Sequence, residues 1–93
     1  MGALDRFRLD GTVAIVTGAG RGIGAGCARV YAEAGADVVI TARTKDQLDA
    51  VAEDVRAFGR RALVVPGDVT DLSFLGTLVE RAVGELGRVD HVV

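Results

Sequence analysis

The amino-acid sequence predicts an α/β fold built on a doubly wound parallel sheet. Four short apolar runs, rich in β-branched residues, begin at intervals of about 25 residues. Segments with helical periodicity separate these runs. Strand–helix–strand repeats of this length imply right-handed crossovers between parallel strands. If the sheet follows the nucleotide-binding pattern, its strand order is 3-2-1-4.

The four apolar runs are the predicted strands. They are TVAIVT (12–17), ADVVIT (36–41), ALVVPG (62–67) and VDHVV (89–93). The first three are almost continuously apolar, as expected for strands that are covered on both faces. Pro66 ends the third run and has no backbone N–H, so we expect that strand not to be paired on both sides.

Apolar residues recur at helical spacing between the strands, which predicts one helix in each interval. The predicted core-facing residues are Ile23, Cys27, Val30, Tyr31 and Ala34 in the first helix, Leu48, Val51, Ala52 and Val55 in the second, and Leu72, Leu75, Val79, Ala82 and Leu86 in the third. Thr44 and Gln47 predict a capping box at the start of the second helix. Gly35, Gly59 and Gly87 follow the three helices, where a left-handed residue is expected.

Composition limits the class of protein. A chain of 93 residues forms at most one domain, for which roughly 100–150 residues is the usual size. With 49% apolar and 26% charged residues it is typical of a soluble globular protein. The formal net charge of −2 argues against a nucleic-acid partner, and no apolar stretch approaches the roughly 20 residues of a membrane span. The single cysteine, Cys27, suits a packing role in a reducing cytoplasm.

The segment TGAGRGIG (17–24) places four glycines directly after the first strand. At the carboxyl ends of parallel strands, next to the start of a helix, such a turn favours a phosphate group. A P-loop is excluded because Lys and Ser or Thr are missing from its end. The dinucleotide pattern G-x-G-x-x-G/A fits Gly20, Gly22 and Ala25, a methyl-donor site has a similar turn, and a purely structural turn stays a minor alternative.

The register that fits better is Thr17-Gly18-x-x-x-Gly22-x-Gly24, and with it the sequence resembles the short-chain dehydrogenase/reductase family and its TGxxxGxG motif. GDVTD (67–71) is similar to the family's adenine motif, and GRVDHVV (87–93) to the approach to its fourth strand. The resemblance covers the whole chain. It implies that residues 1–93 are the Rossmann-type NAD(P)-binding portion of a single domain, ending before the catalytic segment.

The resemblance also implies roles for the turn. Gly18 permits the tight exit from the strand, Gly22 the close approach of a pyrophosphate, and Gly24 close packing of the helix on the sheet. Gly20 belongs to the same cofactor-binding turn, and Ile23 offers its backbone N–H to the pyrophosphate.

Asp68 and Val69 are expected to frame the adenine. The Asp68 carboxylate can accept a hydrogen bond from the adenine amino group. Its alternative role is that of a turn or N-cap residue before the third helix, although Thr70 or Asp71 can serve as that cap.

The end of the second strand favours NADP over NAD. NAD-specific sites carry an acid there for the ribose 2′-hydroxyl, whereas this chain has Ala42 followed by Arg43. Arg21 adds a second guanidinium in the glycine turn, and two such groups suit a 2′-phosphate. The alternative is that Arg43 is only a solvated loop residue.

The implied reaction is hydride transfer between NADP(H) and a small carbonyl or alcohol substrate, in a parent protein expected to be a homo-oligomer. None of the family's catalytic residues can be assigned, because the chain has no Asn, and Gly35 instead of Lys follows Tyr31 by four residues. His91 is expected to pack within a strand, and no metal site is predicted. The alternative is a non-catalytic nucleotide-binding module that ends at Val93.

Overall fold

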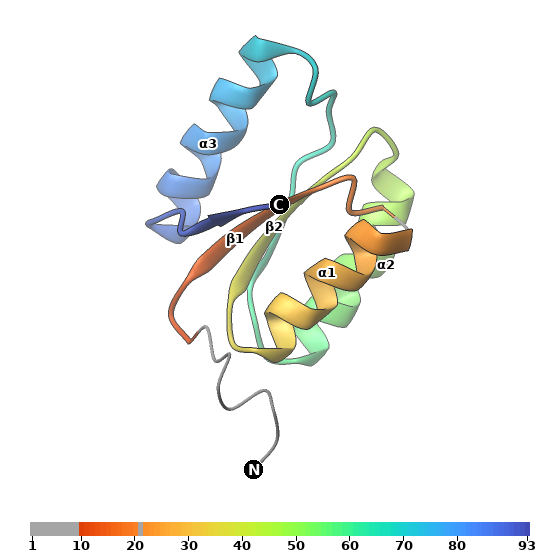
Figure 1. Cartoon of the computed structure of the whole chain (residues 1–93), viewed down its shortest axis with the longest axis vertical. Coiled ribbons are helices and arrows are strands. Elements are labelled where there is room, and N and C mark those ends of the chain that lie inside the picture. Colours follow the sequence, from red (N-terminus) through yellow and green to blue (C-terminus); the bar gives the residue numbers. More distant parts are fainter. Residues whose placement is uncertain (1–9, 21) are drawn as a thin grey trace.

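Strands and helices alternate along the chain in the computed structural model, which describes residues 10–20 and 22–93 (Figure 1). The elements are β1 (Val13–Thr17), α1 (Gly22–Glu33), β2 (Asp37–Thr41), α2 (Lys45–Ala57), β3 (Ala62–Val64), α3 (Leu72–Leu86) and β4 (His91–Val92). All strand pairs are parallel and the order is β3-β2-β1-β4. The predicted α/β class, doubly wound sheet and strand order are therefore confirmed.

The sheet is organised around β1. It pairs with β2 from Val13 opposite Asp37 to Thr17 opposite Thr41, and with β4 on its other side. β3 lies at the edge, where its described pairing is with β2 alone, and it ends before Pro66 as expected for a residue without a backbone N–H. Because the chain turns first to β2 and later crosses to β4, the order reverses at the carboxyl end of β1.

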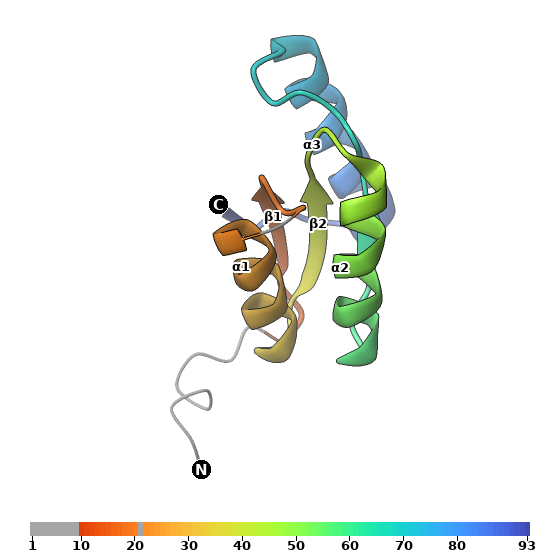
Figure 2. The same cartoon turned by 90° about the vertical axis from the view of Figure 1, so that its right-hand side faces the viewer.

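Helices cover both faces of the sheet, which explains why the strands are almost continuously apolar (Figures 1 and 2). Val16 and Ile40 point toward α1 and α2, where they pack with residues such as Leu48. Ile15 and Val39 point to the opposite face, where α3 supplies the buried Leu78 and Ala82.

The predicted core face of α1 is wrong at two of its five positions. Ile23 is 88% exposed and Val30 is 57% exposed, while three alanines are buried against the sheet: Ala25, Ala28 and Ala32. Of the predicted face, Cys27 and Tyr31 are half-buried against the same core, and Ala34 is buried just after the helix. The helix backbone lies close to the sheet, so only small side chains fit beneath it.

Residue 24 is where this close approach is tightest. A Cβ at Gly24 would overlap the carbonyl oxygen of Gly18 and would lie 3.2 Å from the Cα of Ala19. Gly26, two residues further along α1, has open space where its Cβ would be. The two glycines of one helix therefore differ in how much room surrounds them.

The other two helices follow the prediction more closely. All four predicted residues of α2 are buried. In α3, Ala82 is buried and Leu75 and Leu86 are half-buried, but Leu72 is 82% exposed and Val79 is exposed, and Leu78 takes the central position. The buried stripe of α3 is therefore centred on Leu78 and Ala82, in the middle of the helix, and differs from the predicted one by part of a turn.

The helix ends agree with the prediction only in part. Gly35, Gly59 and Gly87 have positive φ, as predicted. Thr44 is the N-cap of α2 by position, but its side chain makes no capping hydrogen bond, so the predicted capping box is not formed. Asp71 caps α3 through the N–H groups of the next turn.

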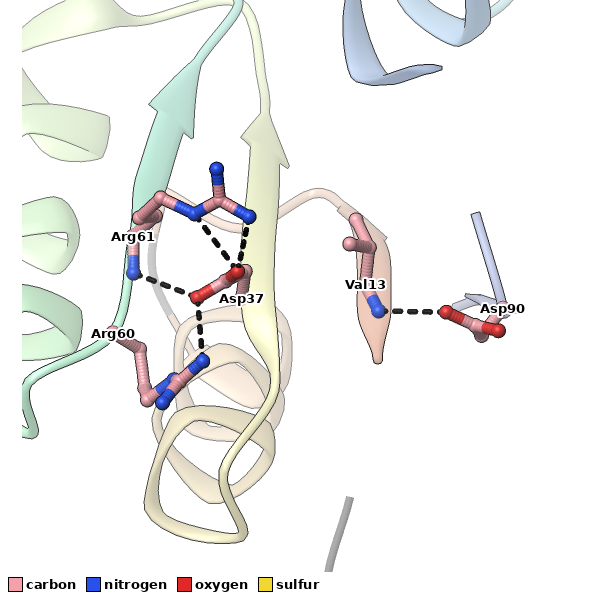
Figure 3. Close-up of polar contacts among 5 residues, drawn as sticks. All are labelled: Val13, Asp37, Arg60, Arg61 and Asp90. Carbon is pink, nitrogen blue, oxygen red and sulfur yellow. Dashed lines mark hydrogen bonds and ion pairs between the residues drawn. The ribbon is translucent and has the colours of Figure 1, made fainter. Parts of the chain in front are cut away.

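Two carboxylates hold the amino end of the sheet together (Figure 3). Asp37, only 4% exposed, accepts hydrogen bonds from the Arg61 backbone N–H and Nε, both at 2.9 Å, and pairs with Arg60 at 3.1 Å. Asp90 accepts the backbone N–H of Val13 at 2.9 Å. These acids link the starts of neighbouring strands at the end of the sheet opposite the glycine turn.

Substitution of the two α1 glycines tests the tight contact. We expect Gly24→Ala to lower the free energy of unfolding by roughly 1–3 kcal/mol, because the new methyl group overlaps backbone that cannot move away. The matched control Gly26→Ala should raise it by roughly 0.8–1 kcal/mol through helix propensity. Urea titration of both variants measures the difference, and equal stabilities would contradict the contact.

Acid titration tests the Asp37 cluster. Burial raises the pKa of Asp37, but the hydrogen bonds from Arg61 and the charges of Arg60 and Arg61 together outweigh it, so the pKa lies below its usual value. A depressed carboxyl pKa stabilises the fold above the unfolded value of about 4, and this contribution is lost as the pH falls through the folded value. We expect Asp37→Asn to lower stability at neutral pH by roughly 1–3 kcal/mol and to flatten the loss of stability below about pH 4.

The matched control is Asp54→Asn, which removes an exposed ion pair with Arg29. Such surface pairs contribute about 0–1 kcal/mol. An Asp37→Asn variant that keeps the full acid dependence of the wild type would show that the Asp37 cluster does not cause it.

Candidate functional site

Three segments meet at the carboxyl ends of the strands. The Ala19 N–H in the glycine turn donates to the Thr41 carbonyl at 3.1 Å, and the Gly67 N–H after β3 donates to the Ala42 carbonyl at 3.0 Å. The turn after β1, the segment after β2 and the segment after β3 thus form one continuous edge. This edge includes the position where the strand order reverses.

The glycine turn presents an open backbone surface. Gly18 and Gly22 have φ values of +62° and +63°, and a Cβ at either would meet nothing within 4 Å. α1 begins at Gly22 and has no acidic residue in its first turn. Because the first N–H groups of a helix lack partners within it and carry the positive end of its dipole, this geometry fits an anionic group.

Gly24, the third glycine of the motif, lies beneath this surface and not on it. Its missing Cβ lets α1 contact the backbone of Gly18. The side chain of Ile23 is exposed and contributes nothing to the core beneath the turn.

Gly20 lies against the second helix. A Cβ there would be 2.8 Å from Oε1 of Gln47, 3.2 Å from Cβ of Gln47 and 3.5 Å from Cβ of Ala42. The sequence did not place Gln47 at the site, because its position three residues after Thr44 has the spacing of a capping box. The signal in the sequence that could have pointed to this contact is Gly20, because a glycine leaves space for a neighbouring side chain.

Arg43 and Asp68 are brought together from the ends of β2 and β3. Nη2 of Arg43 lies 3.3 Å from a carboxylate oxygen of Asp68, and the two side chains are 76% and 45% exposed. Surface pairs of this kind contribute about 0–1 kcal/mol, so a more highly charged anion can draw Arg43 away.

Asp68 also accepts hydrogen bonds from Thr70, at 2.7 Å from the hydroxyl and 2.9 Å from the backbone N–H. The Thr70 hydroxyl, then its N–H, then the nearby Arg43, lower the pKa of Asp68, which is therefore ionised and an acceptor at neutral pH. It shapes the turn before α3 without capping that helix, since the N-cap is Asp71.

The remaining predicted site residues are less informative. Val69 is half-buried beside Asp68. Arg21 lies outside the described residues, so its predicted place in the glycine turn has no structural account.

The titratable aromatic residues lie away from this edge. Tyr31 is near the end of α1, about 13 Å along the helix from Gly22. Its ring lies 5.6 Å from that of His91 on β4, in keeping with the packing role expected of His91. Nε2 of His91 is buried and finds no hydrogen-bond partner among residues 10–20 and 22–93.

Within those same residues, no group of three His, Cys, Asp or Glu side chains is placed to hold a metal ion. None of the described helices combines the length and apolar character that crossing a bilayer requires.

Known proteins are similar to this chain in sequence and in fold. A protein of Mycobacterium tuberculosis (strain CDC 1551 / Oshkosh), named as an uncharacterized oxidoreductase, is 52% identical over 90 residues, which are 97% of this chain and 34% of that protein. Carveol dehydrogenase from Mycobacterium avium, solved in complex with NAD, matches with a TM-score of 0.87 and 31% identity over 91% of this chain and 35% of that one. A 7 alpha-hydroxysteroid dehydrogenase complexed with NADH and 7-oxo glycochenodeoxycholic acid matches with a TM-score of 0.90 and 38% identity over 99% of this chain and 36% of that one.

The chain therefore spans about a third of the length of these proteins. A family model described as short chain dehydrogenase matches residues 12–93. From the fold, the glycine turn and this match, the chain belongs to the short chain dehydrogenase family.

Proposed function

We propose that the chain is the cofactor-binding portion of an oxidoreductase that transfers hydride between NADP(H) and a small carbonyl or alcohol substrate. The observation that carries this proposal is the exposed Arg43 beside Asp68, at a strand end where Ala42 stands in place of an acid. A nicotinamide cofactor, when bound, would supply or accept the hydride.

The glycine turn is the proposed pyrophosphate site. Gly18 and Gly22 leave its backbone open, and we propose that the N–H of Ile23, at the start of α1, donates to the phosphate. Gly24 supports the site by letting the helix lie close to the turn, and Gly20 leaves space for the side chain of Gln47.

The adenosine end is assigned to the segments after β2 and β3. Asp68 accepts from the adenine amino group and Val69 offers an apolar edge to the ring. Arg43, with Arg21, binds the ribose 2′-phosphate in the forked geometry that guanidinium groups favour.

NAD is the competing cofactor, since the carveol and hydroxysteroid dehydrogenases were solved in complex with NAD and NADH. An NAD-type site uses an acid after the second strand, and Ala42 cannot accept a hydrogen bond from a ribose hydroxyl through its side chain. The exposed cation at Arg43 supports NADP instead.

The proton-transfer groups of the reaction are proposed to lie in other segments of a longer protein. Relatives of this chain are about three times its length, which supports this division. The lone Cys27 supports a reducing compartment, and we propose the cytoplasm.

Removal of Arg43 tests the choice of cofactor. A hydrogen bond to a charged group contributes on the order of 1.5–3 kcal/mol, so Arg43→Ala should weaken NADPH binding roughly ten- to a hundredfold. NADH binding should barely change, because NADH has no 2′-phosphate. Fluorescence titration of the full-length gene product that contains this chain measures both dissociation constants.

The control for that experiment is Arg81→Ala, which removes another exposed guanidinium, paired with Glu85 on α3. It should leave both dissociation constants unchanged. Equal losses of NADPH and NADH affinity in Arg43→Ala would mean that Arg43 does not contact the phosphate.

The 93-residue chain alone should show no NADPH-dependent turnover of aldehydes or ketones. Its only tyrosine packs beside His91, and its only lysine, Lys45, pairs with Asp49 at the start of α2. Neither is placed to donate a proton at a carbonyl. Following NADPH absorbance over a panel of carbonyl compounds tests this; turnover that is lost in Gly22→Val but kept in Tyr31→Phe would show that another side chain of the chain acts as the acid.

A further inference from the structure

We propose that Gln47 is a specificity-determining residue that contacts the 2′-position of the cofactor's adenosine ribose, next to Arg43. Ala42 follows β2 where an NAD-type site carries an acid, and the Gln47 side chain lies close to the glycine turn at the same end of the sheet. This role rests on the proposed function, because it requires a dinucleotide at the carboxyl edge of the sheet.

The position of Gln47 follows from the packing of the two helices. α1 and α2 lie side by side on one face of the sheet, with their N-terminal ends toward the same end (Figure 2). Gln47, in the first turn of α2, reaches across to the turn that precedes α1. Its Oε1 lies 2.8 Å from the point where a Cβ of Gly20 would be, and Cβ of Ala42 lies 3.5 Å from that same point.

The reason why residue 20 must be small differs from the reason at the neighbouring glycines. Gly18 and Gly22 have left-handed backbone and open space, while Gly24 faces backbone atoms. Gly20 has no positive φ, and the three atoms nearest to its missing Cβ among the described residues are side-chain atoms, two of them from Gln47. The half-buried Gln47 side chain therefore lies against the turn at Gly20.

The chemistry of the carboxamide suits this place. It forms no hydrogen bond with any residue in the described part of the chain, and the capping box that would have engaged it is absent. A carboxamide accepts through its oxygen and donates through its NH₂ group. Gln47 can therefore accept from a ribose 2′-hydroxyl or donate to a 2′-phosphate, neither of which the Ala42 side chain can do.

The decisive variant is Gln47→Glu, which puts a carboxylate in the same volume. We expect it to weaken NADPH binding roughly ten- to a hundredfold, because like charges would then face each other, and to leave NADH binding unchanged or a few-fold tighter. Gln47→Ala should weaken both by a few-fold. Glutamate in the first turn of a helix is favourable, so Gln47→Glu should fold.

The charge-matched control is Ala57→Glu, at the exposed far end of α2, about 15 Å along the helix. It should leave the ratio of the NADPH and NADH dissociation constants at the wild-type value. Gln47→Glu with that same ratio would overturn the proposal.

A second measurement tests the contact with Gly20. Gly20→Ala should weaken binding of both cofactors in the wild-type background, because its methyl group displaces the carboxamide, and should have little effect when Gln47 is alanine. Equal effects in the two backgrounds, or no effect in either, would overturn the proposed coupling. Thermal unfolding of each variant separates loss of binding from loss of fold.

All titrations use the full-length gene product. The wild type tests the proposed function, and the Gln47 variants test the role of Gln47. Wild-type protein that binds neither cofactor would refute the proposed function and this role with it. Wild-type protein that binds NADPH, with a Gln47→Glu ratio like that of the wild type, would leave the function standing and refute only the role of Gln47.

Discussion

Helix α1 can lie directly against the open glycine turn because residue 24 has no side chain. The carbonyl of Gly18 occupies the space that a Cβ of Gly24 would need, so the helix contacts the turn through backbone atoms. The three buried alanines continue this close approach along the sheet. Any larger residue at this contact would move the helix N-terminus away from the carboxyl ends of β1 and β2, where the proposed phosphate site lies.

The two ends of the sheet differ in how their polar groups are held. At the amino end, Asp37 and Asp90 each accept hydrogen bonds from several donors (Figure 3). These bonds join the strands and leave few acceptor positions on the two carboxylates for a ligand. At the carboxyl end the polar groups are exposed and loosely paired, as in Arg43 with Asp68. The contacts that stabilise the sheet and the proposed binding site thus lie at opposite ends of the strands. Residues at the binding end can therefore be replaced with less effect on strand pairing.

The adenosine end of the proposed site combines a cation, an anion and a neutral amide within a small region. Arg43 and Asp68 neutralise each other across the ends of β2 and β3 until a more highly charged partner arrives. Gln47 reaches the turn at Gly20 from the neighbouring helix. Cofactor choice would therefore depend on side chains from three separate segments, and not on the residue after β2 alone.

Local pattern in the sequence was enough to predict the strands, the strand order, the helix-ending glycines and the family, because these depend on short-range periodicity and on motifs that are continuous in the chain. Tertiary structure alone decided which face of α1 is buried, since Ala28 and not Val30 fits so close to the sheet. It also showed that Gln47, predicted to belong to a capping box, lies next to Gly20. Arg43 likewise contacts Asp68, which is 25 residues away in the chain. Distances across the fold, which no local pattern encodes, set these contacts.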